Sequence, residues 1–147
     1  MKREILFRGK VSGKRLNKGE WIEGDLVHQL DYYVKPCDKY FILNKYDTND
    51  YEIGEPIQVD PATVGQFTGL TDKNGVKIFE GDKLYCEARL DKAEMYVVFE
   101  EGQFRMVLCD KFKEYETGRG YYDINCFQKT VIGNIHDNPE LVKEESE

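Results

Sequence analysis

The stretch TVGQFTGLTDKNGVKIFEGDKL, residues 63–84, decides the fold that we predict for this chain. Two apolar-rich runs, residues 66–70 and 76–79, flank a short polar segment at residues 72–75. Asp and Asn side chains bond to nearby backbone, and glycine adopts positive φ without steric cost. The pattern therefore predicts a β-hairpin with a Gly-containing turn.

Breaks and strands continue on both sides of this hairpin. Gly81 and Asp82 interrupt the chain, and residues 84–90 then alternate between apolar and polar side chains, as a half-buried strand does. Upstream, Asp60 suits a helix N-cap and Pro61 suits the first helical position. We expect a single helical turn that delivers the chain into the hairpin.

The second half of the chain carries short apolar runs with tight turns between them, at residues 84–90, 95–99, 104–109 and 129–136. Such spacing predicts a curled meander or a partly open SH3-like barrel. We predict a mainly β protein of two small lobes. Residues 1–60 form an N-terminal lobe with an irregular tyrosine-rich segment. Residues 61–147 form the meander or barrel lobe and end in a short helix.

The triplet Glu-Gly-Asp occurs twice, at residues 23–25 and 80–82, each time after two large apolar residues. The pattern indicates a strand that ends in a glycine turn or bulge, used twice. A genuine relation between the lobes and a chance echo both remain open. We assign structural turn roles, not catalytic ones, to the glycines and acids of these breaks: Gly24, Asp25, Gly69, Gly75, Gly81 and Asp82.

Residues 31–55 hold five tyrosines, and their six acidic residues outnumber three lysines. The acidic excess argues against stacking on single-stranded nucleic acid. Two interpretations remain: sheet packing with exposed phenols, and a surface that faces a protein, because tyrosine is favoured at interfaces. The candidate partner-contact residues are four of the five tyrosines of this segment, together with one glutamine of the central hairpin that turn geometry and packing do not explain: Tyr32, Tyr33, Tyr40, Tyr46 and Gln66.

The composition excludes several classes of function. The net charge of −7 opposes non-specific nucleic-acid binding, although the basic N-terminal segment MKREILFRGKVSGKR is a local exception. No run approaches the roughly 18 apolar residues of a membrane span. The charged N-terminus lacks the apolar core of a signal peptide, so we expect a cytoplasmic protein.

Motifs for catalysis, metals and cofactors are missing from the sequence. The cysteines, Cys37, Cys86, Cys109 and Cys126, form no C-x-x-C pair, and two histidines give no zinc spacing. Reduced, packed thiols are the expectation, and a metal site or regulatory disulfide is the alternative. No nucleophile elbow, phosphate loop or dinucleotide fingerprint occurs. We therefore predict no enzyme, no metal and no cofactor, with a carboxylate hydrolase as the remaining catalytic hypothesis.

The extended run VDPATVGQFTGLTDKNGVKIFEGDKL resembles the central signature of the YopX family of phages and prophages. The segments MKREILFRGK, GEWIEGDLV and VIGNIHDNPEL resemble the outer landmarks of that family. The four pieces occur in order and span nearly the whole chain, while residues 31–55 and 109–127 depart from the match. The resemblance implies a mainly β, phage-encoded protein without an assigned activity.

These observations together predict a phage-encoded, non-enzymatic binding or assembly module of the bacterial cytosol. It contacts a protein partner or itself, so a homo-oligomer is included in the prediction. The alternatives are a small-barrel protein that binds nucleic acid through the basic N-terminal segment, and an acidic surface that mimics nucleic acid.

Overall fold

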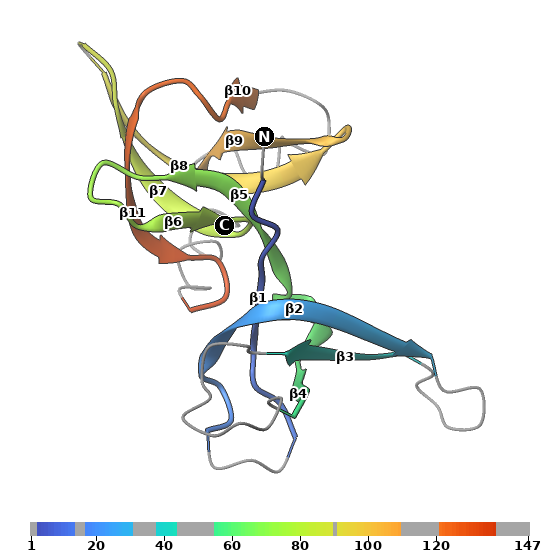
Figure 1. Ribbon diagram of the computed structural model, residues 1–147. Helices are drawn as coiled ribbons and strands as arrows, with labels where there is room; N and C mark the ends of the chain where they lie inside the picture. The colour runs from blue at the N-terminus through green and yellow to red at the C-terminus, as the bar shows by residue number, and fades with distance from the viewer. Residues whose placement is uncertain are drawn as a thin grey trace, which may run out of the picture. The chain divides into compact units, whose positions relative to one another are not determined.

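The computed structural model describes residues 3–13, 17–30, 38–43, 55–89, 91–109 and 121–137. Within these ranges the chain is mainly β and antiparallel, as predicted, with one short 3-10 helix, η1 (Figure 1). The elements in chain order are β1 (Phe7–Lys10), β2 (Trp21–Leu30), β3 (Asp38–Leu43), β4 (Ile57–Val59), η1 (Pro61–Thr63), β5 (Gly65–Thr71), β6 (Lys77–Phe79), β7 (Asp82–Glu87), β8 (Lys92–Glu100), β9 (Gln103–Leu108), β10 (Tyr121–Asp123) and β11 (Gln128–Asn134).

The chain divides into two compact units, Met1–Phe67 and Thr68–Glu147, here called unit 1 and unit 2. The division falls inside β5, whereas the sequence analysis placed a lobe boundary between residues 60 and 61. Pro61 to Phe67 therefore belong to the same compact unit as β1 to β4.

Unit 1 is a sheet in which β4, β3, β2 and β1 lie in that order and the first residues of β5 follow β1. Val11 forms a bridge with Val59, so the chain after β1 also pairs with β4. The buried apolar side chains of this unit are Leu6, Val11, Ile42, Val59 and Phe67. Gly9 of β1 lies against Val59, where there is little room for a side chain. A Cβ on Gly9 would lie 3.0 Å from the Val59 Cβ, so glycine fits this position better than a larger residue.

The predicted helical turn before the hairpin is present as η1. The Asp60 carboxylate accepts a hydrogen bond from the Ala62 amide, as an N-cap does, and Pro61 occupies the start of the turn. The buried Thr63 hydroxyl accepts from the Lys10 amide at 2.9 Å and donates to the Asp60 carbonyl at 2.7 Å. These contacts fix η1 to the end of β1.

One local prediction for unit 1 is wrong. Gly24 and Asp25 form no turn, because both lie inside the continuous ten-residue strand β2. Just before the regular strand β1 begins at Phe7, Leu6 is buried and Ile5 is 60% exposed.

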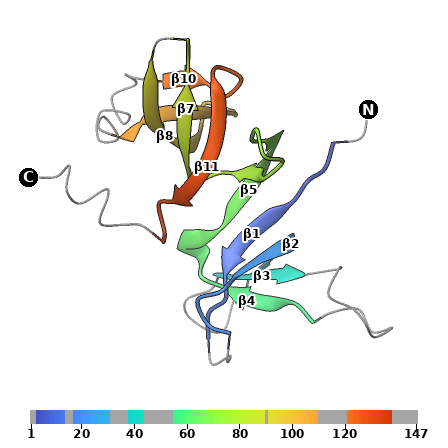
Figure 2. The same cartoon turned by 90° about the vertical axis from the view of Figure 1, so that its left-hand side faces the viewer.

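Unit 2 contains the predicted hairpin and meander. β5 pairs with β6 at the end of the six-stranded sheet. The five-stranded sheet has the order β10-β9-β8-β7-β11, and β7 to β9 each pair with the next strand along the chain. Its strands β7, β8, β10 and β11 are labelled in Figure 2. Its core is a cluster of side chains from one face of this sheet and from the hairpin: Ile78, Leu84, Cys86, Met95, Val97, Met106 and Ile124. The predicted central strand is β8, where Met95, Tyr96 and Val97 are all buried. β10 and β11 are the edge strands, so the described strands form an open curled meander and not a closed barrel.

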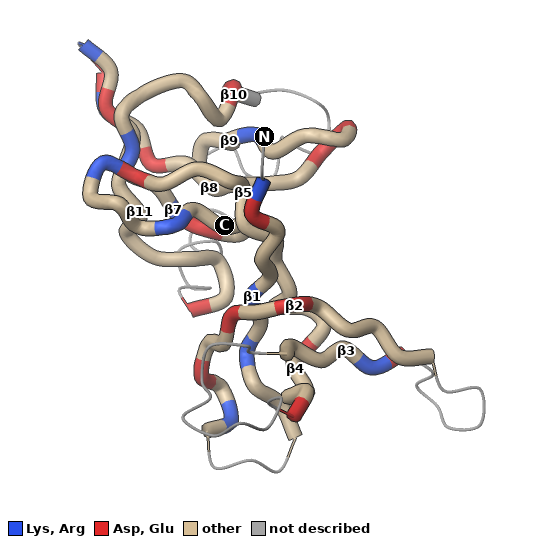
Figure 3. The backbone as a smooth tube through the Cα atoms, in the orientation of Figure 1, with Lys and Arg blue, Asp and Glu red and all other residues tan. Residues whose placement is uncertain are grey.

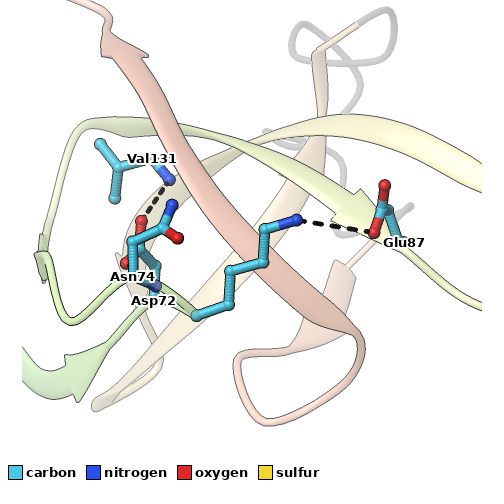
Figure 4. A network of polar contacts seen from close by, with 5 residues as sticks. Asp72, Asn74, Glu87 and Val131 are labelled. Atoms are coloured by element: carbon cyan, nitrogen blue, oxygen red, sulfur yellow. Dashed lines mark hydrogen bonds and ion pairs between the residues drawn. The ribbon is translucent and has the colours of Figure 1, made fainter.

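The turn of the central hairpin is held by one buried carboxylate, that of Asp72. Its Oδ1 accepts from the backbone amides of Asn74 and Val76, at 2.8 Å and 2.9 Å. Its Oδ2 accepts from the Val131 amide of β11 at 3.0 Å, so the turn also covers the edge of β11 (Figure 4). Lys73 beside it lies 3.9 Å from the Glu87 carboxylate.

The final strand departs from the predicted alternation. Its register with β7 shifts between Val131 and Gly133, which is an irregularity of the β-bulge kind. A bulge inserts one residue and moves the following side chains to the opposite face. As a result Asn134, predicted on the same face as Ile132, is 8% exposed whereas Ile132 is 49% exposed.

Several other predictions concern thiols and the C-terminus. Cys86 and Cys126 are free thiols, the first buried and the second exposed, and Cys109 is buried. Cys37 and the predicted terminal helix lie outside the described residues. In the part of the chain that the structure describes, no helix is long and apolar enough to cross a membrane.

Candidate functional site

The far end of the β2–β3 hairpin is the first candidate site. β2 and β3 pair from Asp25 opposite Leu43 to Leu30 opposite Asp38. β4 covers only residues 40–42 of β3, and β1 covers only residues 21–24 of β2. In the described chain the last pairs of the hairpin therefore form a ribbon of two strands, which is marginally stable by itself.

This ribbon exposes apolar side chains. The last four residues of β2 are all exposed, and among them Val27 is 39% and Leu30 52% exposed. Single exposed apolar residues are ordinary on a protein surface. Val27 and Leu30 are three residues apart on β2, so their side chains lie on opposite faces of the ribbon. We call residues 27–30 and 38–40 the hairpin tip.

An aromatic stack stiffens the hairpin tip. The rings of His28 and Tyr40 lie 4.4 Å apart and are nearly parallel, at 3°. Nε2 of His28 lies 3.0 Å from Oδ1 of Asp38, and it carries the proton because a carboxylate only accepts. With the two side chains 43% and 55% exposed, this contact contributes little to stability. Its effect is to hold the ring of His28 in one orientation.

The predicted partner-contact residues are only partly assembled. Tyr40 lies on β3 in the hairpin tip. Gln66 lies on β5 opposite Phe7, and β2 and β1 separate β5 from β3 in the sheet. Tyr32, Tyr33 and Tyr46 lie outside the described residues.

The predicted turn residues of unit 2 adopt the geometry that glycine permits. The φ angles of Gly69, Gly75 and Gly81 are 88°, 81° and 89°. Asp82 is 1% exposed, and its Oδ2 accepts from the Phe79 amide at 2.8 Å. Gly69 belongs to strand β5, so its positive φ occurs within a strand.

The second candidate site is a pocket of about 260 Å³ in unit 2. It lies at one end of the core cluster and opens to solvent beside the β7–β8 turn. Its walls combine apolar, aromatic and thiol side chains with two exposed charged residues, Asp91 of the turn and Lys92 at the start of β8. The lining residues are Cys86, Asp91, Lys92, Ala93, Met95, Leu108, Tyr122 and Phe127.

The strand register explains why these walls converge. Cys86 lies opposite Ala93, and Met95 lies opposite Leu108, so all four side chains share one face of the sheet. Cys86 and Met95 are each 1% exposed and form the floor. Burial raises the pKa of the Cys86 thiol to about 11, with an opposing effect of the nearby Lys129 charge. The thiol is therefore protonated at neutral pH and is a poor nucleophile.

An aromatic pair closes one side of the pocket. The rings of Tyr122 and Phe127 meet edge to face with centroids 5.7 Å apart. Phe127 has a φ of 67°, which is uncommon for a bulky residue and costs conformational energy. Nζ of Lys129 donates to the carbonyls of Cys126 and Phe127 and stabilises this backbone.

Residues of both charge signs are interspersed along the described backbone of both units (Figure 3). The most distinctive cationic contact is on unit 1, where the Arg8 guanidinium lies 4.6 Å and the Lys10 ammonium 5.5 Å from the Trp21 ring centroid. Within the described ranges, no group of three or more His, Cys, Asp or Glu could hold a metal ion.

Sequence patterns alone did not reveal the pocket. The alternation placed Cys86 and Leu108 on apolar strand faces but could not show where the core ends. Phe127 falls in the segment that departs from the family signature, and nothing in its residue type signals a positive φ. The walls of a pocket at the end of a sheet depend on curvature and register, which no local pattern encodes.

Comparison with known proteins now places the chain. A family model described as YopX protein matches residues 10–143. The chain belongs to the YopX family. The prediction from the four sequence landmarks is thus confirmed.

A solved relative of this YopX protein supports the same placement. The crystal structure of protein EF1440 from Enterococcus faecalis is similar over 96% of this chain and 99% of that chain, with 25% identity and a TM-score of 0.55. No curated protein matches the chain. The family match and the similar crystal structure thus establish the family and the fold of the chain, and neither assigns an activity.

Proposed function

We propose that this YopX protein is a non-enzymatic binding module whose hairpin tip contacts a protein partner. The observation that carries the proposal is the exposure of Val27 and Leu30 on a ribbon already stiffened by the His28–Tyr40 stack. Such a surface loses little conformational entropy on binding, because its aromatic side chains are held before the partner arrives.

The chemistry of the described residues supports binding over catalysis. The buried thiol Cys86 is protonated by its surroundings, and the His28–Asp38 pair faces solvent beside a tyrosine with no nucleophile in contact. A catalytic site needs a nucleophile, an acid–base pair or a metal set with convergent geometry. The proposal therefore includes the absence of enzymatic activity.

The test compares matched surface substitutions in pull-downs from a lysate of the bacterium that encodes the protein. Leu30→Asp places a charge in the proposed interface and should reduce retention of the partner by about tenfold or more. Ile132→Asp is the control, because Ile132 is 49% exposed but lies on β11 of unit 2. Wild type and Ile132→Asp should retain the same protein in stoichiometric amount.

Size-exclusion chromatography with light scattering separates a foreign partner from a second copy. A dimer that Leu30→Asp dissociates would identify the partner as the protein itself. A wild-type protein that is monomeric at micromolar concentration and retains nothing would overturn the proposal.

Nucleic-acid binding is a second candidate because Arg8 and Lys10 flank the Trp21 ring on one face of unit 1. Cations beside an aromatic face are a feature of single-strand binding sites. The net charge of −7 opposes it. A mobility shift at low salt that Arg8→Ala weakens would favour this candidate, and no shift at low salt would remove it.

The setting of the protein is also a proposal. The family resemblance supports a phage or prophage origin, and the composition supports action in the bacterial cytoplasm. Neighbouring phage genes in the source genome and recovery of the protein in the cytosolic fraction are the observations that test these two points.

A further inference from the structure

We propose that the pocket of unit 2 binds a neutral aromatic molecule of one or two rings. This inference goes beyond contact with a partner at the hairpin tip and does not rest on it. The pocket is formed within unit 2 by β7 to β10, the β7–β8 turn and Phe127.

The size of the pocket sets the size of the ligand. An apolar cavity of roughly 150 Å³ accommodates benzene. The pocket here measures about 260 Å³, which corresponds to a larger planar molecule such as indole. It is smaller than the sites that enclose drug-sized ligands.

The wall chemistry favours an aromatic over an aliphatic ligand. The floor presents two sulfur atoms, of Cys86 and Met95, and sulfur makes favourable contacts with ring edges at about 5 Å. The side wall presents the Tyr122–Phe127 pair, already arranged edge to face. A third ring can extend this arrangement with the offset or perpendicular geometry that aromatic groups prefer.

The same chemistry requires a neutral ligand. The charged lining residues, Asp91 and Lys92, are exposed and of opposite sign, so they do not select a net charge. The deeper lining, including the protonated Cys86 thiol, offers no compensating charge to an ion. Transfer of an ionised group to such a floor is costly.

The backbone at Phe127 is an independent sign that the wall is maintained for a purpose. Its φ of 67° is unfavourable for phenylalanine, and a glycine or asparagine would adopt it more easily. Residues held in such conformations cluster at ligand-binding positions. The unfavourable backbone conformation of Phe127 places its ring beside that of Tyr122 at the pocket.

The test is NMR of the full-length protein labelled with ¹³C at methionine methyl groups, titrated with indole. The chain has three methionines, Met1, Met95 and Met106. Met95 lines the pocket, so its methyl signal should show a saturable ring-current shift, larger than that of Met106, which is not a lining residue. Indole-5-carboxylate, a charged ring of similar size, should bind about tenfold more weakly or worse.

The pocket itself is tested by substitution. Ala93→Phe places a ring inside the pocket and should weaken indole binding by about tenfold or more. Ala88→Phe is the matched control, because Ala88 is exposed in the neighbouring turn and does not line the pocket. It should bind indole like the wild type.

Three results would overturn the proposal: no shift of the wild-type Met95 signal up to the solubility of indole, equal affinity for the charged ring, or indole binding unchanged in a folded Ala93→Phe protein. The first two use wild-type protein, so they decide the question even if Ala93→Phe fails to fold.

Discussion

Unit 1 and unit 2 use the same three residue types, Glu-Gly-Asp, in different ways. In unit 1 Gly24 lies inside β2, where a Cβ would come 2.1 Å from the Leu43 carbonyl oxygen. In unit 2 Gly81 has a φ of 89°, and a Cβ there would only make ordinary van der Waals contacts with Ile135 and His136, at 3.6 Å. The first glycine is needed for its size and the second for its conformation.

The aspartates of the two triplets differ as well. Asp82 is buried and caps the turn by accepting from the Phe79 amide, whereas Asp25 continues a strand opposite Leu43. Gly81 extends the sheet on both sides, since its amide donates to the Val97 carbonyl and its carbonyl accepts from the Ile135 amide. A shared triplet in sequence thus does not imply a shared turn.

The largest expected effect is that of Gly24→Ala. The new methyl group would collide with backbone, so β2 and β3 must separate locally, at a cost of about 3 kcal/mol. Urea unfolding of the variant against wild type measures this. A loss below about 0.5 kcal/mol would show that the close approach at Leu43 relaxes freely.

Asp82→Ala should have the second-largest effect and lower the free energy of unfolding by about 2 kcal/mol, because the buried Phe79 amide loses its hydrogen-bond acceptor. Asp25→Ala provides the comparison in unit 1, where the side chain is half-buried, and should cost less. Equal losses measured by thermal unfolding would remove the distinction between the two triplets.

Gly81→Ala should cost about 1 to 2 kcal/mol through its positive φ. Asparagine tolerates such φ values better, so Gly81→Asn should recover part of the loss. Gly24→Asn should show no recovery relative to Gly24→Ala, since its problem is steric. Denaturant unfolding gives the difference in stability between the Ala and Asn variants at each site. The sign of that difference shows whether the glycine is needed for its backbone conformation or for its small size.

The smallest effect concerns Asp72 and depends on pH. Burial alone would raise the pKa of Asp72, but three backbone hydrogen bonds and the charge of Lys73 outweigh it and lower the pKa from 3.8. The ionised carboxylate therefore stabilises the folded state above the pKa of the unfolded chain. This contribution is lost as pH falls through the lowered pKa of the folded state.

We expect Asp72→Asn to destabilise the protein by about 1 kcal/mol at neutral pH, because a neutral acceptor replaces a charged one. The difference in the free energy of unfolding between Asp72→Asn and wild type should become smaller as pH falls below about 4. Urea unfolding across this pH range checks the prediction. The control is Lys73→Gln, which keeps the backbone hydrogen bonds of Asp72 and should retain most of the pH dependence. A stability difference between Asp72→Asn and wild type that becomes larger in acid would contradict this interpretation.

Much of the local architecture follows from sequence because it depends on neighbours along the chain. The turn at Asp72 to Gly75 and the cap at Asp60 each satisfy backbone groups within a few residues, so residue type alone predicts them. The alternation around Leu84 and Met106 predicts the buried face of the meander for the same reason.

The tertiary structure decided what depends on residues far apart in sequence. Gly24 is required by Leu43 across the sheet, and Asp72 binds the amide of Val131 on another strand. The last pairs of the hairpin tip, Gln29 with Lys39 and Leu30 with Asp38, have no further described strand beside them, because β1 ends opposite Gly24 and β4 ends opposite Tyr40. The pocket forms where strand register brings Cys86, Met95 and Leu108 to one face. Register and strand length are set by the packing of the whole sheet, which the local sequence does not specify.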